Sequence, residues 1–283
     1  MKIQIVQVPY DSGYKDLRQG RGPTHFIEKN LIGLLEGDGH QVRATRIDAK
    51  SKFTTEIGTA FELNRTLSGE VKAAVESGSF PIVLAGNCNS CLGTIAGIDP
   101  VKLGVVWFDA HGEFNTPETT RSGFLDGMPL AMATGRCWKA ILETIPGFIP
   151  VEESNVILIG ARDLDPEEKR QLQLSGVNVI GSAGIDGDKL LDRVEAALSK
   201  LQDRVSGIYL HIDMDALTID QGAANHFGVS GGLKTEFIET VIAMAKQNFK
   251  LKAGTVASFD PTFDSNNRYL EAGIRCIRQM VID

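Results

Sequence analysis

Short apolar runs alternate with helical patterns along the whole chain, and this alternation restricts the possible folds more than any other feature. A run such as 103–108 has the length of a buried strand, whereas 54–76 has apolar residues at helical spacing. Strand–helix–strand units form right-handed crossovers, so the sequence predicts an α/β fold with a mainly parallel sheet and helices on both faces. The expected strands are 3–8, 41–47, 80–85, 103–108, 155–160, 177–180, 207–213 and 254–259. The expected helices are 23–35, 54–76, 91–98, 138–144, one from Pro166, 187–200, 235–247 and 267–282.

Composition restricts the class of protein further. With 283 residues, 42% of them hydrophobic, the chain can bury a large core, and since no linker interrupts it we expect a single domain, 1–283. The net charge of −7 and the scattered basic residues disfavour nucleic acid and acidic membranes as partners. The start has the pattern of a strand, apolar runs are too short to span a bilayer, and four cysteines are too few for a disulfide framework. These features predict a cytoplasmic protein.

Potential metal ligands follow two of the predicted strands. Three of them come after the run 103–108 at two-residue spacing: Asp109, His111 and Glu113. The second run ends in Asp213 and Asp215, also two residues apart. Two-residue spacing places side chains on one side of an extended backbone, and the carboxyl ends of parallel strands meet at one edge. A lone D-x-D is typical of solvated acids, but so many like charges together predict a divalent cation such as Mn²⁺.

Three motifs resemble signatures of the arginase (ureohydrolase) superfamily, which includes arginase, agmatinase and formimidoylglutamase. Residues 109–117, DAHGEFNTP, resemble DAHxDxNTP, and residues 211–215, HIDMD, resemble S-x-D-x-D. Residues 160–166, GARDLDP, resemble GxRDxDP, and similarity extends nearly from end to end. Because the signatures occur in the family's order on the expected elements, the resemblance is highly specific.

The resemblance implies an arginase-like, three-layer α/β/α fold and a small-molecule substrate. It also implies a binuclear manganese site with a metal-bound hydroxide that attacks an amidino carbon. By residue, it implies that Asp109 and Asp213 bridge the two ions and that His111 and Asp215 complete the coordination of one of them. The family commonly forms trimers or hexamers, so a homo-oligomer is expected.

Residues expected to hold the other ion depart from the family pattern. Cys88 stands where the family has a histidine, and Glu113 stands where it has an aspartate. A thiolate with carboxylates can hold a divalent ion, but sulfur shifts the preference toward softer metals. Two interpretations remain open: one or two ions with Cys88 as a ligand, or a single ion with a buried, inert Cys88.

The expected substrate contacts also differ. Asp126 replaces a family histidine, Phe124 replaces an asparagine that holds an amino-acid head, and Ser258 replaces the glutamate that grips the guanidinium. Three other family substrate contacts are kept: Asn115, Ser122 and Asp165. The turn with Cys88 and the segment HGEFNTPETT resemble most closely a branch that includes the hydroxyarginine hydrolase of D-cycloserine biosynthesis, although that branch keeps the glutamate.

These residues predict a metal-dependent hydrolase of a linear amidino or guanidino C–N bond that is not an efficient arginase. Asp126 and Glu113 are the expected catalytic acids, and Asp126, followed by Asp260, is the candidate to replace the missing glutamate. The alternative is a catalytically degenerate arginase-fold protein with one metal or none, acting as a binding or oligomer subunit.

Overall fold

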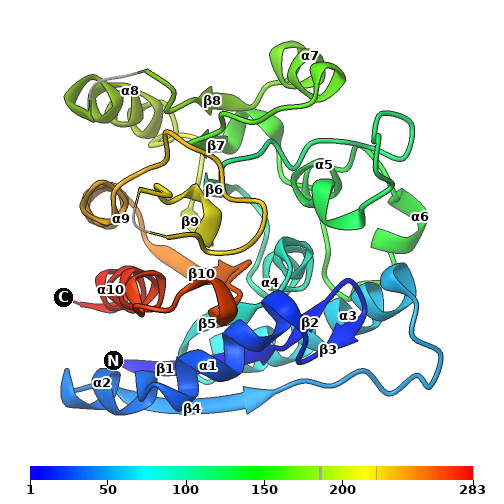
Figure 1. Cartoon of the computed structure of the whole chain (residues 1–283), viewed down its shortest axis with the longest axis vertical. Helices are drawn as coiled ribbons and strands as arrows, with labels where there is room; N and C mark the ends of the chain where they lie inside the picture. Colours follow the sequence, from blue (N-terminus) through cyan, green and yellow to red (C-terminus); the bar gives the residue numbers. More distant parts are fainter. Residues whose placement is uncertain (185–186, 221, 283) are drawn as a thin grey trace.

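The computed structural model describes residues 1–184, 187–220 and 222–282. An eight-stranded sheet of parallel pairs crosses the molecule in the order β4-β1-β5-β10-β9-β6-β7-β8 (Figure 1). The strands are β1 Lys2–Val8, β4 Gln41–Arg46, β5 Phe80–Ala85, β6 Leu103–Phe108, β7 Val156–Ile159, β8 Asn178–Ile180, β9 Gly207–Asp213 and β10 Leu251–Ala257. The predicted parallel sheet is confirmed.

Helices cover both faces of this sheet. They are α1 Gly22–Glu28, α2 Leu31–Gly37, α3 Glu56–Glu76, α4 Cys91–Gly97, α5 Pro129–Ala133, α6 Lys139–Leu142, α7 Pro166–Leu174, α8 Gly187–Ser199, α9 Thr235–Asn248 and α10 Arg268–Val281. In Figure 1, α8, α9 and α10 lie to the left of the sheet and α3, α4, α5 and α6 to the right.

The two layers of helices bury two separate apolar cores. Side chains of β6 alternate between them: Trp107 belongs to the core with α3, α4 and α5, whereas Val106 and Phe108 belong to the core with α8, α9 and α10. A central strand buried on both faces explains why 103–108 is continuously apolar. The arrangement confirms the three-layer α/β/α fold.

Several element boundaries differ from the prediction. The helix expected at 23–35 is interrupted, because Asn30 has a left-handed backbone (φ +66°) between α1 and α2. The loop after β1 contains a small antiparallel hairpin of β2 Tyr10–Asp11 and β3 Tyr14–Lys15. The last strand ends at Ala257, so Ser258 lies just beyond it with φ +64°. In addition, α5 was not predicted.

The sheet order brings the functional strand ends together. β6 lies directly beside β9, with Phe108 paired with Ile212, and β9 lies beside β10, with Asp213 paired with Ala257. β10 also pairs with β5, whose end leads into the short 3₁₀ helix Cys88–Ser90. Among the described residues, no helix is long and apolar enough to cross a membrane.

Candidate active site

The first group of potential metal ligands joins the ends of β6 and β9. Nδ1 of His111 lies 3.4 Å from Oδ1 of Asp109 and 3.5 Å from Oδ2 of Asp215. One ligand atom from each residue lies within 4.8 Å of the others. Two carboxylates and one imidazole can therefore meet a single cation here.

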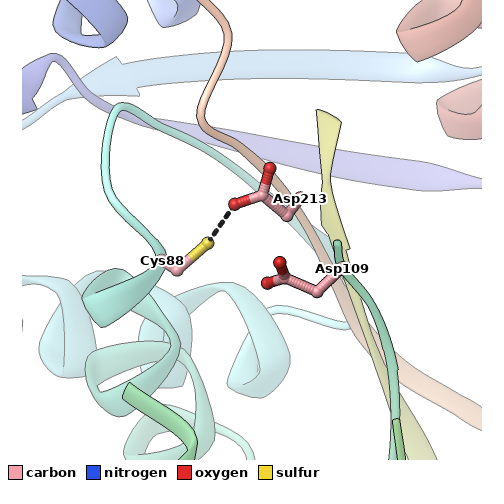
Figure 2. Close-up of side chains that lie close together, drawn as sticks. All are labelled: Cys88, Asp109 and Asp213. Atoms are coloured by element: carbon pink, nitrogen blue, oxygen red, sulfur yellow. Dashed lines mark hydrogen bonds between the residues drawn. The ribbon is translucent and has the colours of Figure 1, made fainter. Parts of the chain in front are cut away.

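A second group shares Asp109 with the first. Its members are Cys88, Asp109 and Asp213, again with ligand atoms within 4.8 Å of one another. Figure 2 shows the three side chains directed toward a common centre, with Cys88 Sγ 2.9 Å from Oδ2 of Asp213. Cys88 comes from the turn after β5, so three separate strand ends contribute to this group.

The electrostatics of these groups fit divalent cations. Asp109, Asp213 and Asp215 are each at most 3% exposed. Burial raises the pKa of the Asp213 carboxyl well above its ordinary value, and the charges of Asp215 and Asp109 raise it further. Buried carboxylates at this density are costly unless positive charge compensates them, and the oxygen, nitrogen and sulfur donors present are suitable ligands.

The surroundings of Cys88 distinguish a metal ligand from a nucleophilic cysteine. Nε2 of His211 lies 3.1 Å from Sγ of Cys88, and its Nδ1 lies 2.8 Å from the Tyr209 hydroxyl. The His211 ring stacks on that of Trp107, with 3.6 Å between the ring centroids. Burial lowers the pKa of His211 to about 3, so its imidazole is neutral. Burial and the Asp213 carboxylate raise the pKa of the Cys88 thiol. Neither shift favours a thiolate–imidazolium pair, whereas a bound cation would stabilise the thiolate.

Glu113 does not join either ligand group among the described residues. Its backbone has φ +53°, and its side chain is 7% exposed and lines the pocket. Burial raises the pKa of its carboxyl well above its ordinary value, and the neighbouring Asp109 and Asp126 charges add to the shift. Oε2 has no hydrogen-bond partner among the described residues, so this oxygen is available to a cation or a substrate.

Asp126 is tied to the turn that carries Cys88. Its Oδ2 accepts a 2.9 Å hydrogen bond from the backbone N–H of Cys88, and its Oδ1 accepts a 2.7 Å bond from that of Asn89. The carboxylate thus holds Cys88 in place, and Asp126 also lines the pocket. Asp126 therefore has a positioning contact that the sequence did not reveal.

A pocket of about 290 Å³ opens beside the ligand groups. The sequence-predicted residues that line it are His111, Glu113, Asn115, Ser122, Phe124, Asp126, Asp165, Asp213, Asp215 and Ser258. The Ser258 hydroxyl lies 3.4 Å from Sγ of Cys88. Cys88 and Asp109 are fully buried and do not line the pocket. The structure brings the predicted set together, although their individual roles stay predictions.

Asp260 does not line this pocket. Its Oδ1 accepts hydrogen bonds from the backbone N–H and the hydroxyl of Thr262, at 3.0 and 2.7 Å. It caps a 3₁₀ helix, Pro261–Phe263, and lines a separate depression with Tyr14 and Arg18. Asp260 therefore lines a different depression from the predicted site residues, and its part as the replacement acid stays a prediction.

Sequence reasoning missed several residues at this site. The pocket is also lined by Gln19, Asp163, Glu168 and Phe227. Glu168 accepts a 2.8 Å hydrogen bond from the backbone N–H of Phe114, and burial raises its pKa to about 7. One sequence feature could have indicated that His211 belongs to the site. It stands two residues before Asp213 in the same strand and therefore lies on the same face of the sheet.

A parallel α/β sheet with two groups of potential metal ligands beside a pocket at its carboxyl edge is an arrangement that fits a metal-dependent hydrolase. A sequence model of the Arginase family matches residues 1–282. An arginase of Staphylococcus aureus (strain COL) is 30% identical over 290 residues, which cover 97% of this chain and 95% of that protein.

Solved structures agree with this match. The crystal structure of arginase from Bacillus cereus has a TM-score of 0.90 at 26% identity and covers 100% of this chain and 99% of its own. An agmatine ureohydrolase of Thermoplasma volcanium shares the fold, with a TM-score of 0.73 at 15% identity over 99% and 88% of the two chains. The chain belongs to the arginase family, whose members are metal-dependent hydrolases that act on guanidino groups.

Proposed function

We propose that this protein hydrolyses a linear C–N bond in an amidino or guanidino compound with the help of divalent ions, and that it is not an efficient arginase. The observation that carries the proposal is the pair of ligand groups sharing Asp109 beside an acidic pocket. A protein without metal would have no physical reason to crowd these buried carboxylates.

The ligand groups indicate how metal would be held. Asp109, His111 and Asp215 would hold one ion, and oxygen donors with an imidazole suit Mn²⁺. Cys88, Asp109 and Asp213 would hold a second, for which the sulfur also admits a softer divalent metal. A bound ion would lower the pKa of a water molecule and so supply a nucleophile near neutral pH. Glu113, whose Oε2 has no hydrogen-bond partner among the described residues, could complete either ion.

Two acids are proposed to meet the reacting end of the substrate, Glu113 and Asp126. The neighbouring Ser258 offers a neutral hydroxyl, which cannot offset the charge of a guanidinium. Burial raises the pKa of both carboxyl groups, which suits a group that passes a proton to a departing amine. Asp126 already accepts two backbone hydrogen bonds, so Glu113 has the greater capacity to accept new ones.

The outer part of the pocket is proposed to contact the rest of the substrate. Asn115 donates to Oδ2 of Asp165 at 3.4 Å and so links two of the predicted contacts. Ser122 accepts from the backbone N–H of Phe124 at 3.2 Å, which leaves its own hydroxyl hydrogen available.

We further propose that residues 1–283 form one domain that works as a homo-oligomer in the cytoplasm. Four unpaired cysteines support a reducing compartment. The homo-oligomer is proposed from the family resemblance. Light scattering on the purified protein would test the oligomeric state, and a strictly monomeric mass would contradict the proposal.

The test is metal analysis on protein purified without chelators, followed by a urea and ammonia release screen. The screen covers arginine, agmatine, hydroxyguanidines, ureido compounds and simple amidines. We expect bound divalent metal and an arginine turnover about a hundredfold or more below that of the best substrate, since losing one charged contact costs about 2–4 kcal/mol. Arginine turnover at an ordinary metabolic rate would refute the interpretation of Ser258. Absence of both metal and hydrolysis would favour the binding or oligomer subunit.

Variants at the two acids separate their roles. Asp126→Asn and Glu113→Gln should both lower turnover of cationic amidines. The larger loss should follow Glu113→Gln, because Oε2 of Glu113 has no other hydrogen-bond partner in the described part of the chain. Asp203→Asn, an exposed acid far along the chain, is the matched control. If only Asp126→Asn abolished activity on cationic substrates, Asp126 would be the replacement acid.

A further inference from the structure

Gln19 has a buried side-chain amide that borders the pocket without a hydrogen bond. The residue lines the pocket and is 2% exposed. Within the described ranges of the chain, its amide makes no hydrogen bond to another residue. The large majority of buried polar side-chain atoms in proteins have a partner. The two N–H donors and the carbonyl acceptor of Gln19 are therefore available to a molecule in the pocket.

The segment that carries Gln19 lies on the side of the pocket next to Ser258. Gly22 of the same segment approaches Phe259 so closely that a Cβ on this glycine would lie 2.4 Å from the Phe259 carbonyl oxygen. Phe259 directly follows Ser258, whose hydroxyl lies 3.4 Å from Sγ of Cys88. The close backbone packing therefore holds Gln19 on the side of the pocket that adjoins the second ligand group.

Other polar groups on this side of the pocket already have partners. Both carboxylate oxygens of Asp126 accept backbone hydrogen bonds, and the Ser258 hydroxyl is paired with the sulfur of Cys88. By contrast, Oε2 of Glu113 and the amide of Gln19 have no hydrogen-bond partner among residues that the structure describes. One acid and one neutral amide are thus left to meet the reacting end of a substrate.

A neutral amide and a carboxylate favour amidino groups of different charge. A cationic amidino group has only N–H donors, and in a buried site its charge is costly unless a carboxylate offsets it. An uncharged amidino group has N–H donors and one nitrogen with a free lone pair. The carbonyl of Gln19 can accept from such a donor, and its N–H can donate to that lone pair. The amide therefore matches the uncharged form on both sides.

We propose that Gln19 is a specificity-determining residue that hydrogen-bonds the reacting end of the substrate and favours amidino compounds that are uncharged when bound. The inference rests on the proposed function, because the ligand groups and Glu113 assign the reacting end to this side of the pocket. An electron-withdrawing substituent on an amidino nitrogen makes such a compound weakly basic, and so neutral near pH 7. The preferred substrate class is therefore a weakly basic, N-substituted amidine or guanidine.

Binding of two small probes to the Mn²⁺-loaded protein, measured by calorimetry, tests the preference. Cyanoguanidine is neutral near pH 7 and methylguanidine is cationic, and the two are similar in size. We expect cyanoguanidine to bind about tenfold or more tightly, because only its uncharged amidino group matches the amide. Equal affinities, tighter binding of methylguanidine, or no binding of either probe would overturn the inference.

Variants of Gln19 then assign the preference to this residue. Gln19→Glu keeps the shape of the side chain and adds a charge, so it should bind methylguanidine about tenfold more tightly than the wild-type protein and cyanoguanidine more weakly. If Gln19→Glu fails to fold beside the other acids, Gln19→Leu decides. It should weaken the binding of cyanoguanidine about tenfold, because it removes the amide.

The matched control is Gln202→Glu, the same substitution at an exposed residue whose amide donates to Asn248 outside the pocket. It should leave both affinities as they are in the wild-type protein. All variants should hold as much metal as the wild-type protein, because the Gln19 amide belongs to neither ligand group. An unchanged ratio of affinities in Gln19→Glu and Gln19→Leu, or loss of metal from both, would overturn the assignment.

The outcome is separable from that of the proposed function. A preference for cyanoguanidine that is lost in the Gln19 variants, without hydrolysis of any amidino compound, would support the role of Gln19 and refute hydrolysis. Hydrolysis of amidino compounds with the same charge preference in the wild-type protein and in Gln19→Glu would refute the role of Gln19 and support the proposed function.

Discussion

The chemistry of Cys88 depends on the groups that surround its thiol. Burial and nearby carboxylates raise its pKa, and the adjacent His211 is held neutral by burial. A thiol in such surroundings is a poor nucleophile, but a divalent ion would stabilise its thiolate. The residue is therefore better suited to hold an ion than to attack a substrate.

Cobalt substitution would test the role of Cys88. Protein loaded with Co²⁺ should show a sulfur-to-metal charge-transfer band, because a thiolate ligand donates electron density to the ion. The band should be absent from Cys88→Ser and retained in Cys91→Ser, a neighbouring buried cysteine. If the wild-type protein had no such band, Cys88 would be a bystander and the single-ion interpretation would stand.

Glu168 is expected to make the free energy of unfolding depend on pH. Burial raises its pKa from 4.5 to about 7, so between these values the folded protein binds more protons than the unfolded chain. The free energy of unfolding should therefore fall by roughly 2–3 kcal/mol from pH 5 to pH 8 through this group.

Denaturant titrations of the metal-free protein at both pH values would measure this contribution. Glu168→Gln should show a smaller fall than the wild-type protein, while Glu36→Gln, an exposed glutamate, should follow the wild-type protein. An identical fall in Glu168→Gln would show that the carboxyl titrates normally.

At the level of elements, the site depends on turns that follow strands. The turn after β5 is held by Asp126, and the end of β9 is held by Arg162 through backbone carbonyls. Helix α3 packs against α4, which begins at the end of the Cys88 turn. The stability of α3 therefore supports the placement of Cys88.

The N-cap of α3 offers a test at this scale. Thr55 accepts a 3.1 Å hydrogen bond from the backbone N–H of Gly58, which satisfies one of the free donors at the helix start. Thr55→Ala should lower the free energy of unfolding by about 1 kcal/mol in a denaturant titration. Thr54→Ala, the exposed preceding residue, should change it little. Equal effects would show that the cap does not contribute.

In the whole molecule, the ligand groups connect strands that are distant in sequence. Ends of β5, β6 and β9 all contribute potential ligands, so a bound ion would oppose separation of the central sheet. Ions that bind the folded state and not the unfolded chain stabilise by mass action, by about 2.7 kcal/mol at a hundredfold excess over Kd.

Thermal unfolding should therefore respond to metal. The wild-type protein should have a higher Tm with Mn²⁺ than after chelation, whereas Asp213→Ala should have lost metal and most of this difference. Asp203→Ala, an exposed acid, should behave like the wild-type protein. Full metal stoichiometry in Asp213→Ala would refute the assignment of this ligand.

Local pattern was sufficient to predict the alternating elements and the acids that follow two strands. Two-residue spacing and apolar runs act over a few residues, so Asp109, His111, Asp213 and Asp215 could be assigned to one edge from sequence. Boundaries were less accurate where one residue departed from its neighbours, as Asn30 does with its positive φ.

Only the tertiary packing determined which residues contact one another in the site. Sγ of Cys88 lies beside Asp213, 125 residues away along the chain, and the Asp126 carboxylate is occupied by backbone donors of the Cys88 turn. Phe227 reaches the pocket through a loop with no periodic pattern. Such contacts depend on how distant segments pack, and residue spacing carries no information about them. The sequence by itself determined the fold class and the strand-end acids, whereas only the tertiary structure showed which side chains are left free to meet a substrate.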